Sequence, residues 1–172
     1  MASYTVNDYL LDRVQVEETL HKLLWFVDRK EWDKISTVFA DKIIVDYTDL
    51  LGGEPAHTTG VDQGKVWEGM LEYVDATQHN ATSIILDLPS PTANVQRPTE
   101  VTLTCNVFAS HVRKEVLAGS MLQNGGRYQM KIIRTDDKSG NPWRISVMKA
   151  FGIFYTGNTG ITKNPETGIA WM

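Results

Sequence analysis

The chain has 172 residues, of which 42% are hydrophobic, and this is enough for one domain with a sizeable core. Its net charge is −4 and its acidic and basic residues are scattered, which argues against nucleic-acid and membrane-surface partners, and its apolar runs are too short to span a bilayer. The single Cys105 excludes an internal disulfide, and an N-terminus without a signal pattern predicts a cytoplasmic protein.

The first predicted element is an amphipathic helix over residues 7–28. Its hydrophobic positions recur at helical spacing and are Val16, Leu20, Leu23, Leu24 and Val27. Trp25 and Phe26 widen this apolar face. A short second helix follows, in which one face is shared by Trp32, Ile35, Val38 and Phe39.

The sequence next predicts a strand over residues 42–49 and a loop over 51–60. Asp62 is expected to cap a third helix, whose buried stripe would be Val66, Trp67, Met70, Leu71 and Val74. The period then changes to two, which predicts strands at about 77–88, 99–114, 117–134 and 143–155. Three helices followed by long antiparallel strands indicate the α+β class.

Four polar residues lie at the margins of these apolar faces. Strict alternation places His111 at the end of a row that should face the core, formed by Val101, Leu103, Cys105, Val107 and Ala109. His79 begins another strand, on a face expected to hold Ala81, Ser83 and Ile85. Tyr47 shares a strand face with Ile43 and Val45, and Asp28 follows the apolar stripe of the first helix.

Around one cavity, these four side chains would be suited to acid–base chemistry. A neutral imidazole can take and return a proton near physiological pH, and a carboxylate behind it fixes the tautomer. A phenol can donate a hydrogen bond to a carbonyl oxygen that gains negative charge. A single histidine on an apolar strand face is nevertheless more often structural than catalytic, and Asp28 alone reads as a helix end.

Two sequence blocks carry a resemblance to a known family. The segment DRKEWDKISTVFADKIIVDYTDLL and the TQH motif at 77–79 resemble the scytalone dehydratase and SnoaL-like family, within the NTF2-like superfamily. SHVRK at 110–114 and PWRISVMKA at 142–150 match more weakly, so the resemblance covers about residues 9–155. It implies a single NTF2-like domain over 1–172, in which three helices pack on a strongly curved, mostly antiparallel sheet that encloses a pocket.

The resemblance also implies roles for the four polar residues. His79 would be the general base and later the acid, oriented by Asp28, while His111 would bind or protonate the departing or carbonyl oxygen. Tyr47 would hydrogen-bond the substrate carbonyl, and no metal or organic cofactor would be needed. We further predict that the substrate contacts Trp25, Val27, Met121, Asn124 and Phe151.

The chain departs from the family pattern at two positions. The first of the family's two carbonyl-polarising tyrosines should fall just before Asp28, where this chain has Val27. The family's pocket asparagine should fall near Gly126, and only Asn124 among the nearby amides shares its strand face. These departures indicate the same acid–base machinery on a different substrate.

Three hypotheses follow for the function. The first is a cofactor-independent dehydratase or isomerase acting on a small apolar polyketide-like or terpenoid-like carbonyl compound. The second is a SnoaL-like cyclase or hydrolase-type enzyme of natural-product biosynthesis, and the third is a non-catalytic NTF2-like ligand-binding module. A metal site is the weakest alternative, because His57, His79 and His111 lack a ligand spacing.

The resemblance also bears on assembly and on the C-terminal tail. Family members pack sheet faces together, which predicts a homodimer or homotrimer, with Thr102, Thr104 and Phe108 on the outer face. The tail, about residues 156–172, is expected either to cover the pocket as a lid or to serve as an ordered subunit contact.

Overall fold

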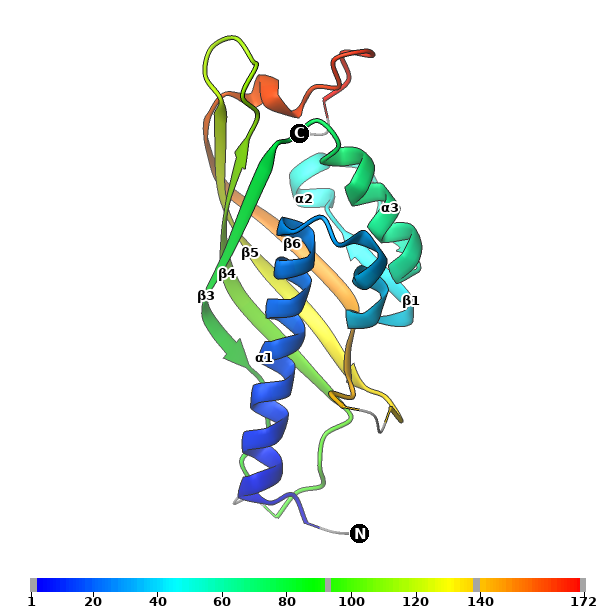
Figure 1. Cartoon of the computed structure of the whole chain (residues 1–172). Helices are drawn as coiled ribbons and strands as arrows, with labels where there is room; N and C mark the ends of the chain where they lie inside the picture. The colour runs from blue at the N-terminus through cyan, green and yellow to red at the C-terminus, as the bar shows by residue number, and fades with distance from the viewer. Residues whose placement is uncertain (1–2, 92–93, 138–139, 171–172) are drawn as a thin grey trace.

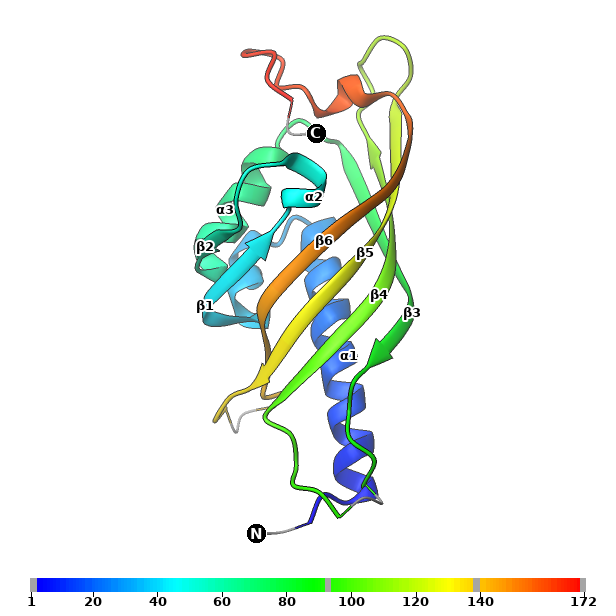
Figure 2. The same ribbon diagram turned by 180° about the vertical axis from the view of Figure 1, so that it is seen from behind.

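Four long strands and one long helix form the frame of the molecule (Figure 1). The computed structural model describes residues 3–91, 94–137 and 140–170. The strands are β3 (Ala76–Leu86), β4 (Glu100–Val112), β5 (Met121–Arg134) and β6 (Trp143–Gly157). Helix α1 (Val6–Asp28) lies along one face of this sheet, and Figure 2 shows that the opposite face carries no helix. The predicted α+β cone is therefore confirmed.

Most of the smaller elements gather at the edge of the sheet opposite β3 (Figure 1). They are η1 (Trp32–Val38), β1 (Phe39–Asp46), α2 (Thr48–Leu51), β2 (Ala56–Thr58) and α3 (Gly60–Met70), while η3 (Thr159–Thr162) follows β6 and contacts β5. The strand order is β2-β1-β6-β5-β4-β3, in which β1 runs parallel to β6 and the other neighbours are antiparallel. Helix α3 packs on η1 and β1, so the helices enclose the concave side of the sheet near its upper end (Figure 1).

The inner face of β4 shows why the sheet buries one side. The nonpolar residues of the alternating row 101–109 are each at most 5% exposed, and His111 at its end is 4% exposed. These β4 side chains share one core with the buried stripe of α1, which lies on the same face of the sheet and includes Val16, Leu20 and Leu23. The face predicted from alternation is thus the core face.

Helix α1 begins at a reciprocal capping box. The Thr5 hydroxyl accepts a hydrogen bond from the Asp8 backbone N–H at 3.1 Å, and an Asp8 carboxylate oxygen accepts one from the Thr5 backbone N–H at 3.2 Å. The prediction that Asp62 caps helix α3 is wrong. The N-cap is Thr59, whose hydroxyl accepts a hydrogen bond from the Asp62 backbone N–H.

Several predicted boundaries are corrected in the helical half. The second helix is a 3₁₀ segment, and Phe39 is the first residue of β1. The expected strand at 42–49 ends at Asp46, and the expected loop at 51–60 contains β2. Helix α3 ends at Met70, and Val66 is 53% exposed, because Trp67 and Leu71 occupy the face toward the core.

A bulge in β3 corrects another prediction. The β3–β4 register shifts between Thr82 and Ile85, and Ser83 adopts a positive φ of 52°. Ile84 consequently packs against the core while Ile85 is 66% exposed. Ile85 therefore does not share the inner face with His79. The extra residue also bends the strand, which adds to the curvature of the sheet.

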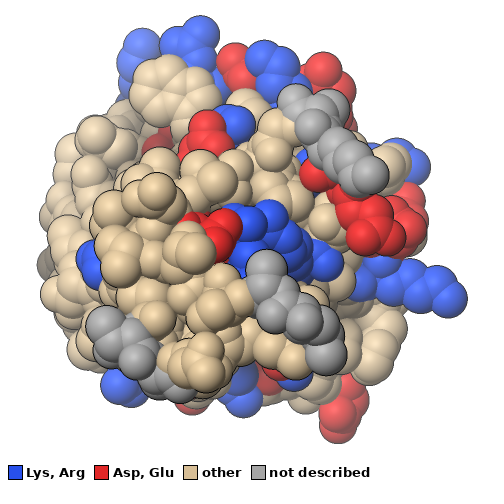
Figure 3. All heavy atoms as spheres, turned by 90° about the horizontal axis from the view of Figure 1, so that it is seen from below, with Lys and Arg blue, Asp and Glu red and all other residues tan. Residues whose placement is uncertain are grey.

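Surface charge is mixed at the lower end of the molecule. In the view along the molecule from its lower end, acidic and basic side chains lie among uncharged surface and form no field of one sign (Figure 3). No helix of the described residues is long and apolar enough to cross a bilayer.

Candidate active site

The centre of the candidate site is a histidine–carboxylate pair that joins α1 to β3. Asp28 is the last residue of α1 and His79 lies near the start of β3. One Asp28 carboxylate oxygen lies 2.7 Å from His79 Nδ1, and the other accepts the His79 backbone N–H, also at 2.7 Å. Because the Asp28 carboxylate can only accept, the neutral form of the ring carries its proton on Nδ1 and has the lone pair on Nε2.

The end of α1 is itself held in place by Lys30. This residue leaves the helix with a positive φ of 54°. Its ammonium group donates to the backbone carbonyls of Val74 at 2.6 Å and Leu71 at 3.1 Å. Since this segment leads directly into β3, Lys30 fixes the spacing between the two elements that carry Asp28 and His79.

His79 opens onto a mostly apolar pocket inside the cone. The cavity volume of the pocket is about 100 Å³, which is small beside the roughly 300–1,000 Å³ of typical ligand sites, so it suits a small ligand. Its apolar wall comes from α1, α2, α3 and β6 and includes Leu24, Val27, Trp67, Met70 and Met148. No Lys, Arg, Asp or Glu lines the pocket among the described residues, so it suits an uncharged ligand.

His111 lies beside His79 in the same pocket. The two rings meet edge to face, with centroids 5.7 Å apart. The Thr77 hydroxyl is 3.0 Å from His111 Nδ1, and Asn124 Oδ1 is 3.2 Å from Nε2. With the amide oxygen accepting from Nε2–H, Nδ1 accepts from Thr77, so the imidazole is neutral. Burial, reinforced by the nearby His79, lowers the pKa of His111 to about 4.

Two tyrosines complete the polar part of the pocket. Tyr47 lies between β1 and α2, and the Trp67 indole forms a hydrogen bond with its hydroxyl. Tyr128 lies on β5 and lines the same pocket. Burial raises the pKa of both phenols far above the ordinary value of 10.0, so both remain protonated donors at neutral pH.

The structure therefore brings together six of the predicted site residues. His79, His111, Tyr47, Asn124 and Val27 line the pocket, and Asp28 stands directly behind His79.

The other three predicted substrate contacts lie elsewhere, which corrects their assignment to the pocket. Trp25 is 61% exposed on the outer side of α1, with the Arg29 guanidinium over its ring. Phe151 lies between Arg127 and Lys149, away from the pocket lining. Met121 is 45% exposed, and its odd spacing of three from Asn124 puts it on the opposite face of β5.

Two residues of the site were not predicted from the sequence. Tyr128 follows Asn124 at an even spacing of four, so alternation alone could have placed it on the pocket face. Thr77 belongs to the TQH motif, and its register partner is His111 on β4, which no sequence pattern shows.

The described residues contain no group of three or more His, Cys, Asp or Glu side chains arranged to hold a metal ion. Met70 separates the pocket from a second hollow, which lies between α3 and the tail residues 161–170. The tail thus lies near the pocket, and residues 171–172 of the predicted lid are outside the described part of the chain.

Comparisons with known proteins agree with this architecture. A family model described as SnoaL-like domain matches residues 8–149, and no curated protein matches the chain. Among solved structures, the Kfla4162 protein from Kribbella flavida has a TM-score of 0.77 at 22% identity, over 90% of this chain and 99% of that one.

Two further solved structures have named activities. A candidate scytalone dehydratase from Novosphingobium aromaticivorans DSM 12444 has a TM-score of 0.68 at 18% identity, over 87% of this chain and 89% of that one. The hexachlorocyclohexane dehydrochlorinase LinA-type3 from Novosphingobium barchaimii LL02 has a TM-score of 0.67 at 15% identity, over 92% and 97%. At these identities the likeness establishes a shared fold.

Proposed function

Because this chain belongs to the SnoaL-like domain family, we propose that it is a cofactor-independent lyase or isomerase in which His79 and Asp28 perform acid–base catalysis. The observation that carries the proposal is the pair itself. Both oxygens of Asp28 are engaged by His79, which fixes the ring and leaves Nε2 as the nitrogen available to an apolar pocket. A base held in this way needs little reorganisation before it accepts a proton.

In the proposed reaction, His79 Nε2 takes a proton from the carbon next to a substrate carbonyl. The electron pair of the broken C–H bond moves toward the carbonyl oxygen, where the Tyr47 hydroxyl stabilises the developing charge. For a dehydration, this pair returns to form the C=C bond while the C–O bond at the next carbon breaks. The hydroxyl group then leaves as water with the proton held by His79.

His111 fits a positioning role better than that of the acid. Its two ring nitrogens are engaged by Thr77 and Asn124, and its pKa of about 4 keeps it neutral at neutral pH. A neutral imidazole next to His79 also avoids repulsion when His79 becomes an imidazolium. Its bond to Asn124 Oδ1 leaves the amide N–H₂ group of Asn124 free to donate to a substrate oxygen.

The lining supports a small, mostly apolar and uncharged substrate with at least one carbonyl oxygen. A polyketide-like or terpenoid-like compound has this character. The same base also suits ring closure, as in a cyclase, in which atoms are rearranged without loss. Elimination of hydrogen chloride is a further candidate, supported by the fold likeness to a dehydrochlorinase.

The test uses wild type, His79→Ala, Asp28→Asn and the control His57→Ala, whose side chain is exposed on β2. Each is incubated with β-hydroxy ketones, β-chloro ketones and polyketide-like cyclisation precursors, and product mass is followed. We expect turnover in wild type and in His57→Ala, a rate about 10²–10⁴-fold lower in His79→Ala, and a smaller loss in Asp28→Asn.

The change in product mass separates loss of water, loss of hydrogen chloride, and rearrangement without mass change. Binding of these compounds without turnover, equally tight in wild type and His79→Ala, would contradict the enzyme and favour a binding module.

A further inference from the structure

Tyr128 is a pocket residue that the proposed acid–base chemistry does not yet use. It lies on β5, where it pairs with Cys105 of β4 and Ala150 of β6. Both partners are 1% exposed, so this point of the sheet is deep in the core. Tyr128 and Asn124 are four residues apart on the same face, and both line the pocket with His79.

The inward position between Asn124 and Tyr128 is Gly126, where a Cβ would clash with the Phe151 backbone carbonyl, so the missing side chain lets β6 approach β5. Its register partners are Val107 on β4 and Gly152 on β6. A Cβ at Gly152 would meet Leu50, a pocket residue, at 2.7 Å, so the absence of a side chain there makes room for the α2 wall. Tyr128, His111 and Asn124 line the same pocket.

The Tyr128 hydroxyl has no hydrogen-bond partner among the described residues. Tyr47 differs, since its hydroxyl interacts with the Trp67 indole. A phenol O–H at an apolar wall costs free energy unless a ligand or water accepts its hydrogen bond. No Asp or Glu among the described residues lines the pocket to accept it, and most of the lining is apolar, including Met148 and five leucine side chains. The acceptor must therefore come from the ligand or from water that the ligand displaces.

We propose that Tyr128 is a catalytic residue that donates its hydroxyl hydrogen bond to the carbonyl oxygen of the substrate. This inference rests on the proposed function, and it adds a second donor to the carbonyl oxygen, beside Tyr47. Tyr128 places a donor where charge develops during proton removal, while Asn124 is left to bind a second oxygen such as the departing hydroxyl. The pocket then selects neutral ketones that carry an oxygen on each side of the acidic carbon.

The test measures the carbonyl hydrogen bond directly, without turnover. Acetophenone labelled with ¹³C at its carbonyl is bound to wild type, Tyr128→Phe, Tyr47→Phe and the control Tyr73→Phe, whose tyrosine lies outside this pocket. The C=O stretching band is recorded by infrared difference spectroscopy, and the dissociation constant by titration. Folding of each variant is checked by circular dichroism and thermal melting.

We expect the wild-type band to lie below that of acetophenone in an apolar solvent, because hydrogen bonding weakens the C=O bond. Tyr128→Phe should shift the band to higher wavenumber and weaken binding about tenfold, while Tyr73→Phe changes neither. A folded Tyr128→Phe protein with an unshifted band overturns the proposal, as does a shift in Tyr47→Phe alone. Failure of wild type to bind acetophenone up to its solubility limit also overturns it.

The proposed function is tested by a different result, namely the turnover of His79→Ala. If His79→Ala leaves turnover intact while Tyr128→Phe still shifts the band, Tyr128 recognises carbonyls in a pocket with other chemistry.

Discussion

At the scale of single residues, the arrangement of Asp28 separates two histidines that look alike in the sequence. His79 receives a carboxylate at Nδ1, whereas the two ring nitrogens of His111 face the neutral groups of Thr77 and Asn124. A carboxylate stabilises an imidazolium, and neutral partners in a buried place do not. The difference assigns the proton-carrying role to His79 and leaves His111 as a neutral neighbour.

The neutral state of His111 predicts how stability depends on pH. In the unfolded chain the imidazole binds a proton below its ordinary pKa of 6.5, while in the folded protein it does so only below about 4. Between these values the unfolded state binds more protons, so stability falls as the pH falls from about 6.5 to about 4. Acid should thereby remove up to roughly 3 kcal/mol of unfolding free energy through this residue.

Urea unfolding at several pH values checks this prediction. His111→Gln should be less stable at pH 7 and should lose much of the slope between pH 6.5 and 4, while His57→Gln should retain the wild-type slope. Equal slopes in wild type and His111→Gln would contradict a neutral, buried His111.

At the scale of elements, the sequence predicts faces better than ends. Alternation over 101–111 assigns the inner face of β4 correctly, because one buried side imposes a period of two along a regular strand. The same rule fails in β3 at Ile85, since the bulge at Ser83 inserts a residue that no hydrophobic pattern signals. His79 stands before this bulge, and so its predicted inward position is correct.

The candidate site was predictable in part. Asp28, Tyr47 and His79 could be grouped from motif order, and they do meet in space. Trp25 and Val27 are both hydrophobic, so hydrophobicity alone does not separate them. Two residues two positions apart on a helix point about 200° apart around its axis, and only Val27 faces the pocket. Thr77 required the register of β3 on β4, which is a property of the folded sheet.

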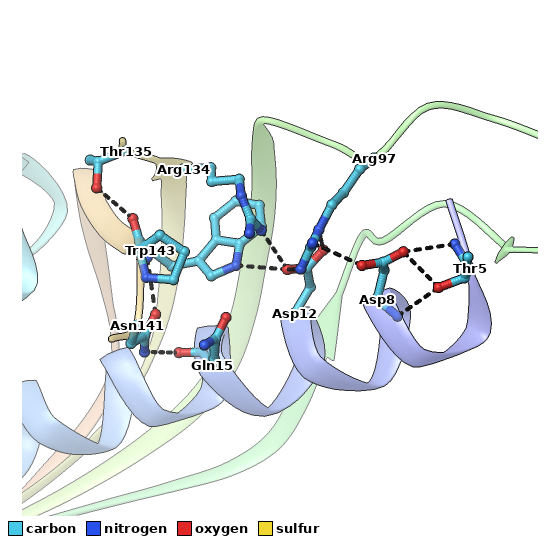
Figure 4. A network of polar contacts seen from close by, with 10 residues as sticks. Thr5, Asp8, Asp12, Gln15, Arg97, Arg134, Thr135, Asn141 and Trp143 are labelled. Carbon is cyan, nitrogen blue, oxygen red and sulfur yellow. Dashed lines mark hydrogen bonds and ion pairs between the residues drawn. The ribbon is translucent and has the colours of Figure 1, made fainter. Parts of the chain in front are cut away.

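At the scale of the whole molecule, the pocket occupies one end of the cone and a buried ionic cluster holds the other. Figure 4 shows Asp12 of α1 between Arg97, Arg134 and the Trp143 indole. The Asp12 side chain is fully buried, and its carboxylate accepts from Arg134 at 2.6 Å and from Arg97 at 2.7 and 2.9 Å. Burial alone would raise the pKa of Asp12, but these arginine bonds outweigh it and lower the pKa.

This cluster predicts a stability effect far from the pocket. Asp12→Ala would leave Arg134 partly buried without its carboxylate, and Arg97 with Asp8 alone, and should cost about 3–5 kcal/mol of unfolding free energy. Asp33→Ala, at an exposed position of η1, should change it by less than about 0.5 kcal/mol. Thermal or urea unfolding measures both, and similar values for the two variants would show that the cluster does not hold the lower end of α1.

The proposed function depends on proton removal by His79 inside the pocket. The most direct measurement is the exchange of the acetophenone methyl protons for deuterium in D₂O, followed by NMR with wild type, His79→Ala and His57→Ala. We expect exchange above the buffer rate with wild type and with His57→Ala, and exchange at the buffer rate with His79→Ala. Equal exchange with wild type and His79→Ala, or none above buffer with any of them, would contradict the proposed function.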